Sequence, residues 1–186
     1  MNERDIKVEK TEGVQPEAES RMIDEGGLGA ETYYKGKDQA ALPIHDTLNE
    51  LVSNLGVFYT KLHQYHWYVQ GPHFFTLHEK FEQLYNETTE YMDSFAERLI
   101  AKRERPVSTL KEFIENATII EEEYIETMSA EEMVDDLIGD FAEMRDTVKR
   151  GVQEASKAGD DVTEDMLIAY NEYIDTTVWM LSAYLR

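Results

Sequence analysis

The chain has 186 residues, 41% of them hydrophobic, which is enough for one domain with a full core. It contains no cysteine, which excludes disulfides, thiolate metal sites and cysteine nucleophiles. Its 18 basic and 39 acidic residues give a formal net charge of −21. This charge disfavours binding to the phosphates of nucleic acids and favours the attraction of cations.

The N-terminal part differs in composition from the rest. Residues 1–43 are polar, with six basic and ten acidic residues and no sustained apolar period, so we expect a flexible acidic tail before one domain over 44–186. The first ten residues, MNERDIKVEK, lack the apolar core of a signal peptide, and no apolar run has the length that a bilayer requires. We therefore expect a cytoplasmic protein with no membrane partner.

Two long helices are predicted in the first half of the domain. The first covers about 44–69 and ends at Gly71-Pro72. The second begins at a capping box of Thr76 and Glu79 and continues to about residue 102. Their buried stripes are predicted at Leu48, Leu51, Leu55, Phe58 and Leu62, and at Leu77, Phe81, Leu84, Thr88, Phe95 and Leu99.

A short helix and two more long helices follow. Capping boxes are predicted at Thr109 with Glu112, at Ser129 with Glu132, and at Asp161 with Glu164. They open, in turn, the short helix TLKEFIEN, a long helix that ends near Gly159, and a last helix that reaches the final residue. The stripes of the two long helices are Met133, Leu137, Phe141, Met144, Val148 and Val152, and Met166, Tyr170, Ile174, Val178, Leu181 and Leu185.

The connection between the second and third long helices is about 25 residues, whereas helix connections in bundles are typically about 2–8. Four long helices with one long crossover are typical of a ferritin-like four-helix bundle, here with a short helix inside the crossover. We therefore predict an all-α fold of this class. The Glu-x-x-His pairs of an internal di-iron site do not occur at suitable positions, which disfavours that kind of site.

Four of the five histidines lie between residues 61 and 85, and imidazoles together with carboxylates bind divalent metals. The candidate ligands in this window are His63, His66, His73, His78, Glu79 and Glu82, and Asp93 and Glu97 lie four apart further along the second helix. We expect His78 at the second position of that helix, where the helix dipole favours the neutral ring that a metal needs.

A reach argument limits which of these residues can share one ion. Asp93 lies fifteen residues beyond His78, or roughly 22 Å along a helix at about 1.5 Å per residue. Either the carboxylates Asp93 and Glu97 are unrelated to the histidines, or an antiparallel second chain supplies them and a two-fold axis makes two sites per dimer. A single-chain alternative stays open, in which His66, His78 and Glu82 form a mononuclear site.

Several stretches together resemble a known family, the Dps-like miniferritins (DNA-binding proteins from starved cells). The stretches are KLHQYHWYVQGPHFFTLHEKFEQLY, MDSFAERLIA, PVSTLKEFIEN, GDDVTEDMLIA and WMLSAYL, and the similarity extends from about residue 45 to residue 186. The most specific pattern is H-x-x-H-W, followed by L-H-E and then D-x-x-x-E-R.

The resemblance implies a ferroxidase that oxidises Fe(II) with hydrogen peroxide or dioxygen and stores ferric mineral in a hollow dodecamer built from two-fold dimers. It implies His66 and His78 as iron ligands and Asp93 and Glu97 as the carboxylates of the neighbouring chain. Glu82 matches a position that helps to hold a second, weaker iron, so a di-iron site is expected.

Further positions also match the family. The resemblance implies that Asp161 and Asp165 line acidic pores, and that Trp67 takes up stray oxidising equivalents. We interpret His63 as an interface or supporting residue, and His45 and His73 as ordinary surface residues. Glu87 and Glu90 are weaker candidates for inner-wall groups that nucleate mineral.

Two rival functions differ in class from a ferroxidase. Some members of the family coat DNA with basic tails, but the tail here is net acidic, so we expect no specific DNA binding, and a nucleoid-associated protein with secondary iron chemistry is the alternative. A purely structural bundle is the other rival, and it predicts that the four proposed ligands are dispensable.

Overall fold

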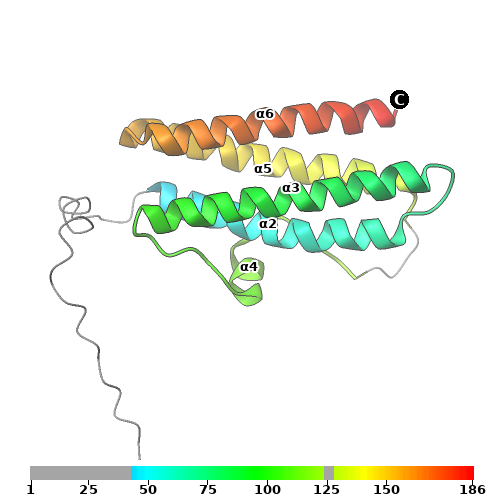
Figure 1. The fold of residues 1–186 in the computed structure, drawn as a ribbon, viewed down its shortest axis with the longest axis horizontal. Coiled ribbons are helices and arrows are strands. Elements are labelled where there is room, and N and C mark those ends of the chain that lie inside the picture. Colours follow the sequence, from blue (N-terminus) through cyan, green and yellow to red (C-terminus); the bar gives the residue numbers. More distant parts are fainter. Residues whose placement is uncertain (1–42, 124–127) are drawn as a thin grey trace, which may run out of the picture. The chain divides into compact units, whose positions relative to one another are not determined.

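A computed structural model of the protein describes residues 43–123 and 128–186. These residues form five helices: α2 (Pro43–Tyr68), α3 (Phe74–Ala101), α4 (Leu110–Asn116), α5 (Ala130–Ala158) and α6 (Asp161–Tyr184). α2 packs on α3, α5 packs on α6, the two pairs meet through α2 and α5, and α4 lies against α2 (Figure 1). The predicted all-α bundle with a short helix in its crossover is confirmed, while the predicted tail lies, except for Pro43, outside the described residues.

The long crossover follows from the direction of the helices. α3 and α5 run the same way along the bundle, so the chain between them must travel back over its length (Figure 1). α3 has 28 residues, which at about 1.5 Å per residue makes it roughly 42 Å long. A connection of a few residues cannot cover that distance, which is why residues 102–129 separate the two helices.

The helices are long because each carries an apolar stripe that a neighbour covers. Every stripe position predicted for α2 and α3 is buried, and so are those of α5 except the half-buried Val152. In α6, Met166 and Val178 are only half-buried and Leu185 is 37% exposed. The buried face of that helix instead includes the two threonines Thr163 and Thr177, which the apolar pattern did not count.

No helix within the described ranges combines the length and apolarity needed to cross a membrane.

Two predicted capping boxes are confirmed. The Thr109 hydroxyl accepts the Glu112 N–H at 3.2 Å, and the Glu112 carboxylate accepts the Thr109 N–H at 3.0 Å. Ser129 and Glu132 make the same reciprocal pair at 3.1 and 2.7 Å. These bonds satisfy amide groups that the first turn of a helix leaves without partners.

The start predicted for α3 is wrong. The helix begins three residues before the expected first turn, with His73 in the N-cap position and no side-chain cap bond. Gly71, at φ 103°, turns the chain so that its carbonyl accepts the Phe74 N–H at 3.1 Å. The Phe74 ring then stacks on the ring of His78 at 5.0 Å, so aromatic packing extends the helix upstream of Thr76. His78 is consequently the fifth residue of α3 and not the second.

The start of α6 also differs from the prediction, by one residue, because the N-cap is Asp160 and not Asp161. The carboxylate of Asp160 accepts the Thr163 N–H at 3.3 Å and a bond from Arg98 at 2.6 Å, and it pairs with Lys102 as well. Burial opposes the ionisation of Asp160, but the bonds from Lys102, Thr163 and Arg98 outweigh it and hold its pKa well below the ordinary range. Asp160 therefore both caps α6 and joins it to the end of α3.

One glycine determines how closely α4 approaches α2. A Cβ atom at Gly56 would lie 2.6 Å from a ring carbon of Phe113, closer than real contacts of this kind. Gly139, inside α5, has no atom within 4 Å of the same position. The two glycines thus share a helical setting but differ in what a methyl group would meet.

We expect Gly56→Ala to be less stable than Gly139→Ala. Alanine in place of a helical glycine gains about 0.5–1 kcal/mol, so Gly139→Ala should raise the free energy of unfolding by that amount. In Gly56→Ala the clash with Phe113 should cost about 1–3 kcal/mol and exceed this gain. Urea unfolding measures both, and equal stabilisation of the two variants would contradict the close contact of α4 with α2.

Candidate metal centre

The end of α2 and the start of α3 bring two histidines face to face. The rings of His66 and His78 stack with centroids 3.7 Å apart and planes 18° from parallel. Nδ1 of His66 lies 2.9 Å from the carbonyl oxygen of His78, and Nδ1 of His78 lies 2.9 Å from the carbonyl oxygen of His66. The structure thus brings two of the candidate ligands together.

These reciprocal bonds fix the chemistry of both rings. A carbonyl oxygen only accepts, so Nδ1 must carry the hydrogen in each ring. In the neutral imidazole the other nitrogen, Nε2, then keeps its lone pair and can bind a metal. Backbone carbonyls commonly orient metal-binding histidines in this way, because the bond fixes both the tautomer and the direction of the ring.

Aromatic side chains adjoin the histidine pair. The Tyr85 ring stacks on His63 at 3.9 Å and meets His66 edge-on at 5.4 Å. Burial, together with the charge of and hydrogen bond to Glu82, raises the pKa of Tyr85. Trp67, 68% exposed, meets His63 edge-on at 5.4 Å. His63 is thus one of the aromatic groups that surround the pair. Nδ1 of its ring lies 2.9 Å from the carbonyl oxygen of Tyr59.

Sequence reasoning missed Tyr85, although its spacing carried a signal. His78, Glu82 and Tyr85 follow one another at intervals of four and three, so they occupy one face of α3. Extending the metal-ligand search to tyrosines on that face would have found it.

The carboxylates Asp93 and Glu97 are exposed on α3, beyond the histidines in the chain. Because α3 is one uninterrupted helix, Asp93 lies roughly 22 Å along it from His78. In the described ranges, no three His, Asp or Glu side chains of one chain are placed so that they could hold a metal ion. The single-chain site of His66, His78 and Glu82 is therefore not formed.

The remaining predicted residues lie elsewhere on the bundle. Asp161 and Asp165 are exposed on the first two turns of α6, one turn apart on the same face. His73 meets the ring of Tyr184 edge-on at 5.5 Å. His45 contacts Asp46 and Asn49, so neither His73 nor His45 adjoins the pair.

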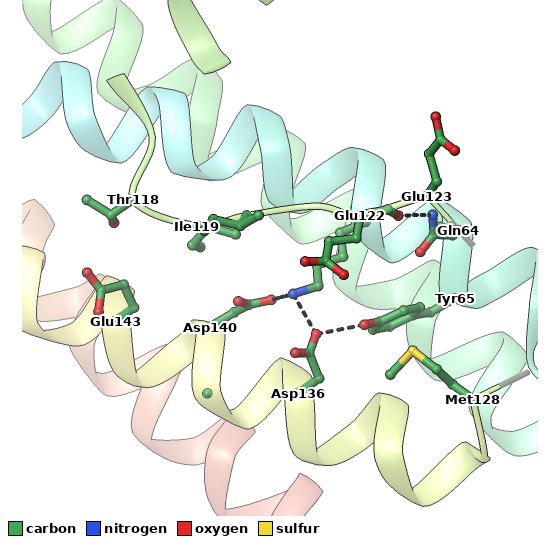
Figure 2. A pocket seen from close by; sticks show the side chains of 13 residues that line it. Gln64, Tyr65, Thr118, Ile119, Glu122, Glu123, Met128, Asp136, Asp140 and Glu143 are labelled. Atoms are coloured by element: carbon green, nitrogen blue, oxygen red, sulfur yellow. Dashed lines mark hydrogen bonds and ion pairs between the residues drawn. The ribbon is translucent and has the colours of Figure 1, made fainter. Parts of the chain in front are cut away.

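A separate cavity of about 850 Å³ lies between α2, α5 and the extended segment of the crossover (Figure 2). The buried ammonium of Lys61 lies 2.5 Å from Asp136 and 2.7 Å from Asp140, and the Tyr65 hydroxyl donates to Asp136 at 2.7 Å. Gln64 holds the crossover above the cavity by donating to the Glu122 carbonyl at 2.9 Å. This network joins α2 to α5 and was not predicted from the sequence.

Burial sets the electrostatics of this network. It raises the pKa of Asp140 to about 6, and the ammonium of Lys61 offsets only part of the effect. Burial also opposes the charge on Lys61, but its bonds to Asp136 and Asp140 outweigh it and raise the pKa of the amine.

Comparison with known proteins assigns the fold to a class. Residues 45–186 match the family model for the ferritin-like domain. The chain therefore contains a ferritin-like domain.

More similar proteins narrow the assignment. The chain is 49% identical over 138 residues to the DNA protection during starvation protein of Listeria innocua, covering 74% of this chain and 88% of that protein. It is also 49% identical over 138 residues to General stress protein 20U of Bacillus subtilis, covering 74% and 94%. The X-ray structure of Dps from Listeria monocytogenes has a TM-score of 0.76 at 45% identity, covering 78% of this chain and 95% of that one. The chain belongs to the Dps family of the ferritin-like superfamily.

The raised pKa of Asp140 makes a testable prediction about pH. Its ordinary value is 3.8, so between about pH 4 and 6 the folded protein holds this proton more tightly than the unfolded chain does. Asp140 should therefore add stability as the pH falls through that range, by about 1–3 kcal/mol. Urea unfolding should show this gain in the wild type and not in Asp140→Asn.

Asp146→Asn is the matched control, because it removes one exposed carboxylate from the same helix and should keep the gain. Asp160 affects stability in a different pH range. Because its pKa is lowered, its contribution to stability is complete above about pH 4 and is lost only below it. If Asp140→Asn gained as much stability as the wild type when the pH falls from about 6 to 4, the gain could not come from protonation of Asp140.

Proposed function

We propose that the protein oxidises Fe(II) at a site shared by two chains and stores the ferric product inside a hollow dodecamer. Hydrogen peroxide is the proposed oxidant, with dioxygen as a substitute. The observation that carries the proposal is the stacked pair of His66 and His78, with Nδ1 of each ring bonded to the backbone and Nε2 left as the metal-binding atom. Membership of the Dps family supports the same function.

The second half of the proposed site comes from another copy. Asp93 and Glu97 cannot reach the histidines of their own chain along a straight α3. An antiparallel partner related by a two-fold axis would bring its carboxylates to the histidines, and the same axis would form a second identical site. Two neutral imidazoles with two carboxylates suit Fe(II), and so modest a negative charge lets the oxidised ion leave.

The proposed reaction uses two ferrous ions for each molecule of hydrogen peroxide. Each Fe(II) gives one electron to hydrogen peroxide, which takes up two protons and becomes two water molecules, so no hydroxyl radical is released. Glu82 would help to hold the second, weaker iron, while Tyr85, stacked on His63, meets the ring of His66 from the side. Trp67, largely exposed beside His63, would take up stray oxidising equivalents.

Acidic groups would bring the substrate to this site. Asp161 and Asp165 are proposed to line pores at which the starts of α6 from several copies meet. Glu87 and Glu90 are weaker candidates for nucleating ferric mineral. A net charge of −21 makes the protein attractive to cations over its whole surface.

Protection of DNA is a second candidate function, because relatives are named DNA protection during starvation proteins. Those names give no support to our expectation that DNA binding is absent, although the net charge of −21 still opposes contact with phosphates. We infer protection by removal of iron and peroxide rather than by coating. A gel shift at low salt separates the two, because retention of DNA by the full-length protein that is lost on removal of the tail would establish coating.

Mixed assembly tests whether the site is shared. One variant carries His66→Ala and His78→Ala, the other Asp93→Asn and Glu97→Gln, and each alone should lose most peroxide-dependent Fe(II) oxidation. When the two are unfolded together and reassembled, each mixed dimer regains one intact site, so about a quarter of the wild-type sites should return. The rate is followed by the absorbance of the ferric product.

His45→Ala with His73→Ala is the control, since it removes two histidines outside the pair and should leave the rate unchanged. Wild-type rates in both ligand variants would support a purely structural bundle. Loss of activity in both without recovery on mixing would show that each site draws its ligands from one chain.

A further inference from the structure

The imidazole of His66 contacts two aromatic rings at different angles. It stacks on the ring of His78 at 3.7 Å with the planes 18° apart, and it meets the ring of Tyr85 at 5.4 Å with the planes 86° apart. The bond from its Nδ1 to the His78 carbonyl, at 2.9 Å, decides which nitrogen keeps a lone pair. The stack covers one face of the imidazole, so its tilt is limited only if a second group confines the rest of the ring. Tyr85 is in the position to be that group.

Tyr85 is held in turn by His63. The two rings stack at 3.9 Å with the planes 23° apart, and the Tyr85 ring also meets that of Tyr59 edge-on at 6.1 Å. His63 and Tyr59 belong to α2 and Tyr85 belongs to α3, so the stack joins the two helices about one turn before His66. The orientation of the Tyr85 ring therefore depends on where the imidazole of His63 is placed.

The imidazole of His63 is fixed to the backbone of its own helix. Its Nδ1 lies 2.9 Å from the carbonyl oxygen of Tyr59, four residues earlier, and since a carbonyl only accepts, Nδ1 carries the hydrogen. His66 and His78 use Nδ1 in the same way at the same distance. All three imidazoles are thus anchored through Nδ1, although only two of them form the stacked pair.

This anchor distinguishes a histidine from an apolar residue in the place of His63. Leucine or phenylalanine could also pack against Tyr85, but neither has a side-chain atom that can donate to a carbonyl. Without that bond the side chain could turn about its own bonds, and Tyr85 would lose a fixed surface to stack on. A connected series of contacts therefore leads from the backbone of α2 through His63 and Tyr85 to His66.

We propose that Tyr85 is a positioning residue for Nε2 of His66, and that His63 acts through Tyr85 by fixing the plane of its ring. Tyr85 confines the imidazole so that the Nε2 lone pair points in one direction, and neither Tyr85 nor His63 binds the ion itself. Groups that orient a ligand in this way commonly affect the affinity for the metal. The inference rests on the proposed function, since it takes Nε2 of His66 as the atom that binds the substrate Fe(II).

The test uses the assembled full-length protein and Co(II), whose visible absorption reports binding to imidazole without an oxidation step. Tyr85→Leu removes the ring and should weaken Co(II) binding by about 10-fold, as the loss of an orienting group does elsewhere. Tyr85→Phe keeps the ring and should bind Co(II) as the wild type does. The Fe(II) concentration for half-maximal oxidation should rise in Tyr85→Leu by a similar factor, with little change in the maximal rate.

Tyr91→Leu is the matched control. Tyr91 is another half-buried tyrosine of α3, but it lies roughly 20 Å along the helix from His78, and its ring packs on those of Tyr170 and Tyr173. Tyr91→Leu should lose stability in urea yet keep the Co(II) affinity of the wild type. Equal losses of affinity in Tyr85→Leu and Tyr91→Leu, or a loss in Tyr85→Phe as large as in Tyr85→Leu, would overturn the proposal.

A double-mutant cycle tests the part assigned to His63. His63→Leu removes the surface that fixes Tyr85 and should weaken Co(II) binding in the same direction as Tyr85→Leu. Combining the two changes should cause no further loss, because His63 acts through a ring that is already gone. Losses that add up in the double variant would show that His63 acts on the site independently of Tyr85, and this half of the proposal would be wrong.

A crystal structure of metal-free Tyr85→Leu keeps the positioning role separate from the proposed function. The imidazole of His66 should leave its 3.7 Å stack on His78 in this variant, whether or not the protein oxidises iron. If the wild type neither binds Co(II) nor oxidises Fe(II), the proposed function fails, and the crystal structure alone decides the positioning role. An imidazole of His66 that stays in place in Tyr85→Leu would overturn that role.

Discussion

The straightness of α3 is the constraint on which the arrangement of the proposed site depends. One uninterrupted helix carries His78 near its start and Asp93 and Glu97 in its second half, so its own rigidity keeps potential ligands apart. A kink would have been needed to gather them, and the 28 residues contain neither proline nor glycine to make one. Any site that uses both groups must therefore combine two copies of the chain.

The turn before α3 complements this rigidity. The chain reverses direction at Gly71 within a few residues, so the start of α3 lies beside the end of α2. The two histidines then hold each other by bonds to the backbone, not to other side chains, and their positions depend on the hairpin rather than on flexible groups. Further along the same helix, the ring of Tyr91 packs against the rings of Tyr170 and Tyr173 on α6.

The fold was largely readable from the sequence because burial follows helical periodicity so closely. The buried positions from Leu48 to Leu62 in α2 recur at three and four, those from Leu77 to Leu99 in α3 at three, four and seven, and Ser129 with Glu132 shows where α5 begins. The predictions failed where two local signals competed. Aromatic packing by Phe74 overrode the capping box at Thr76, and the bonds of Arg98 and Lys102 favoured Asp160 over its neighbour as a cap. The short turn between their helices lets His66 and His78 lie close together, but their reciprocal bonds depend on how the hairpin packs. The network of Lys61 depends on contacts between segments far apart in the sequence.

The bonds between the histidines have a consequence for which atoms of the two rings can act as ligands. Since Nδ1 of each ring is committed to a carbonyl, the only place where an additional proton can bind is Nε2, the atom that a metal would use. The hairpin thus fixes, for each ring, both the nitrogen that can act as a ligand and the direction in which its lone pair points.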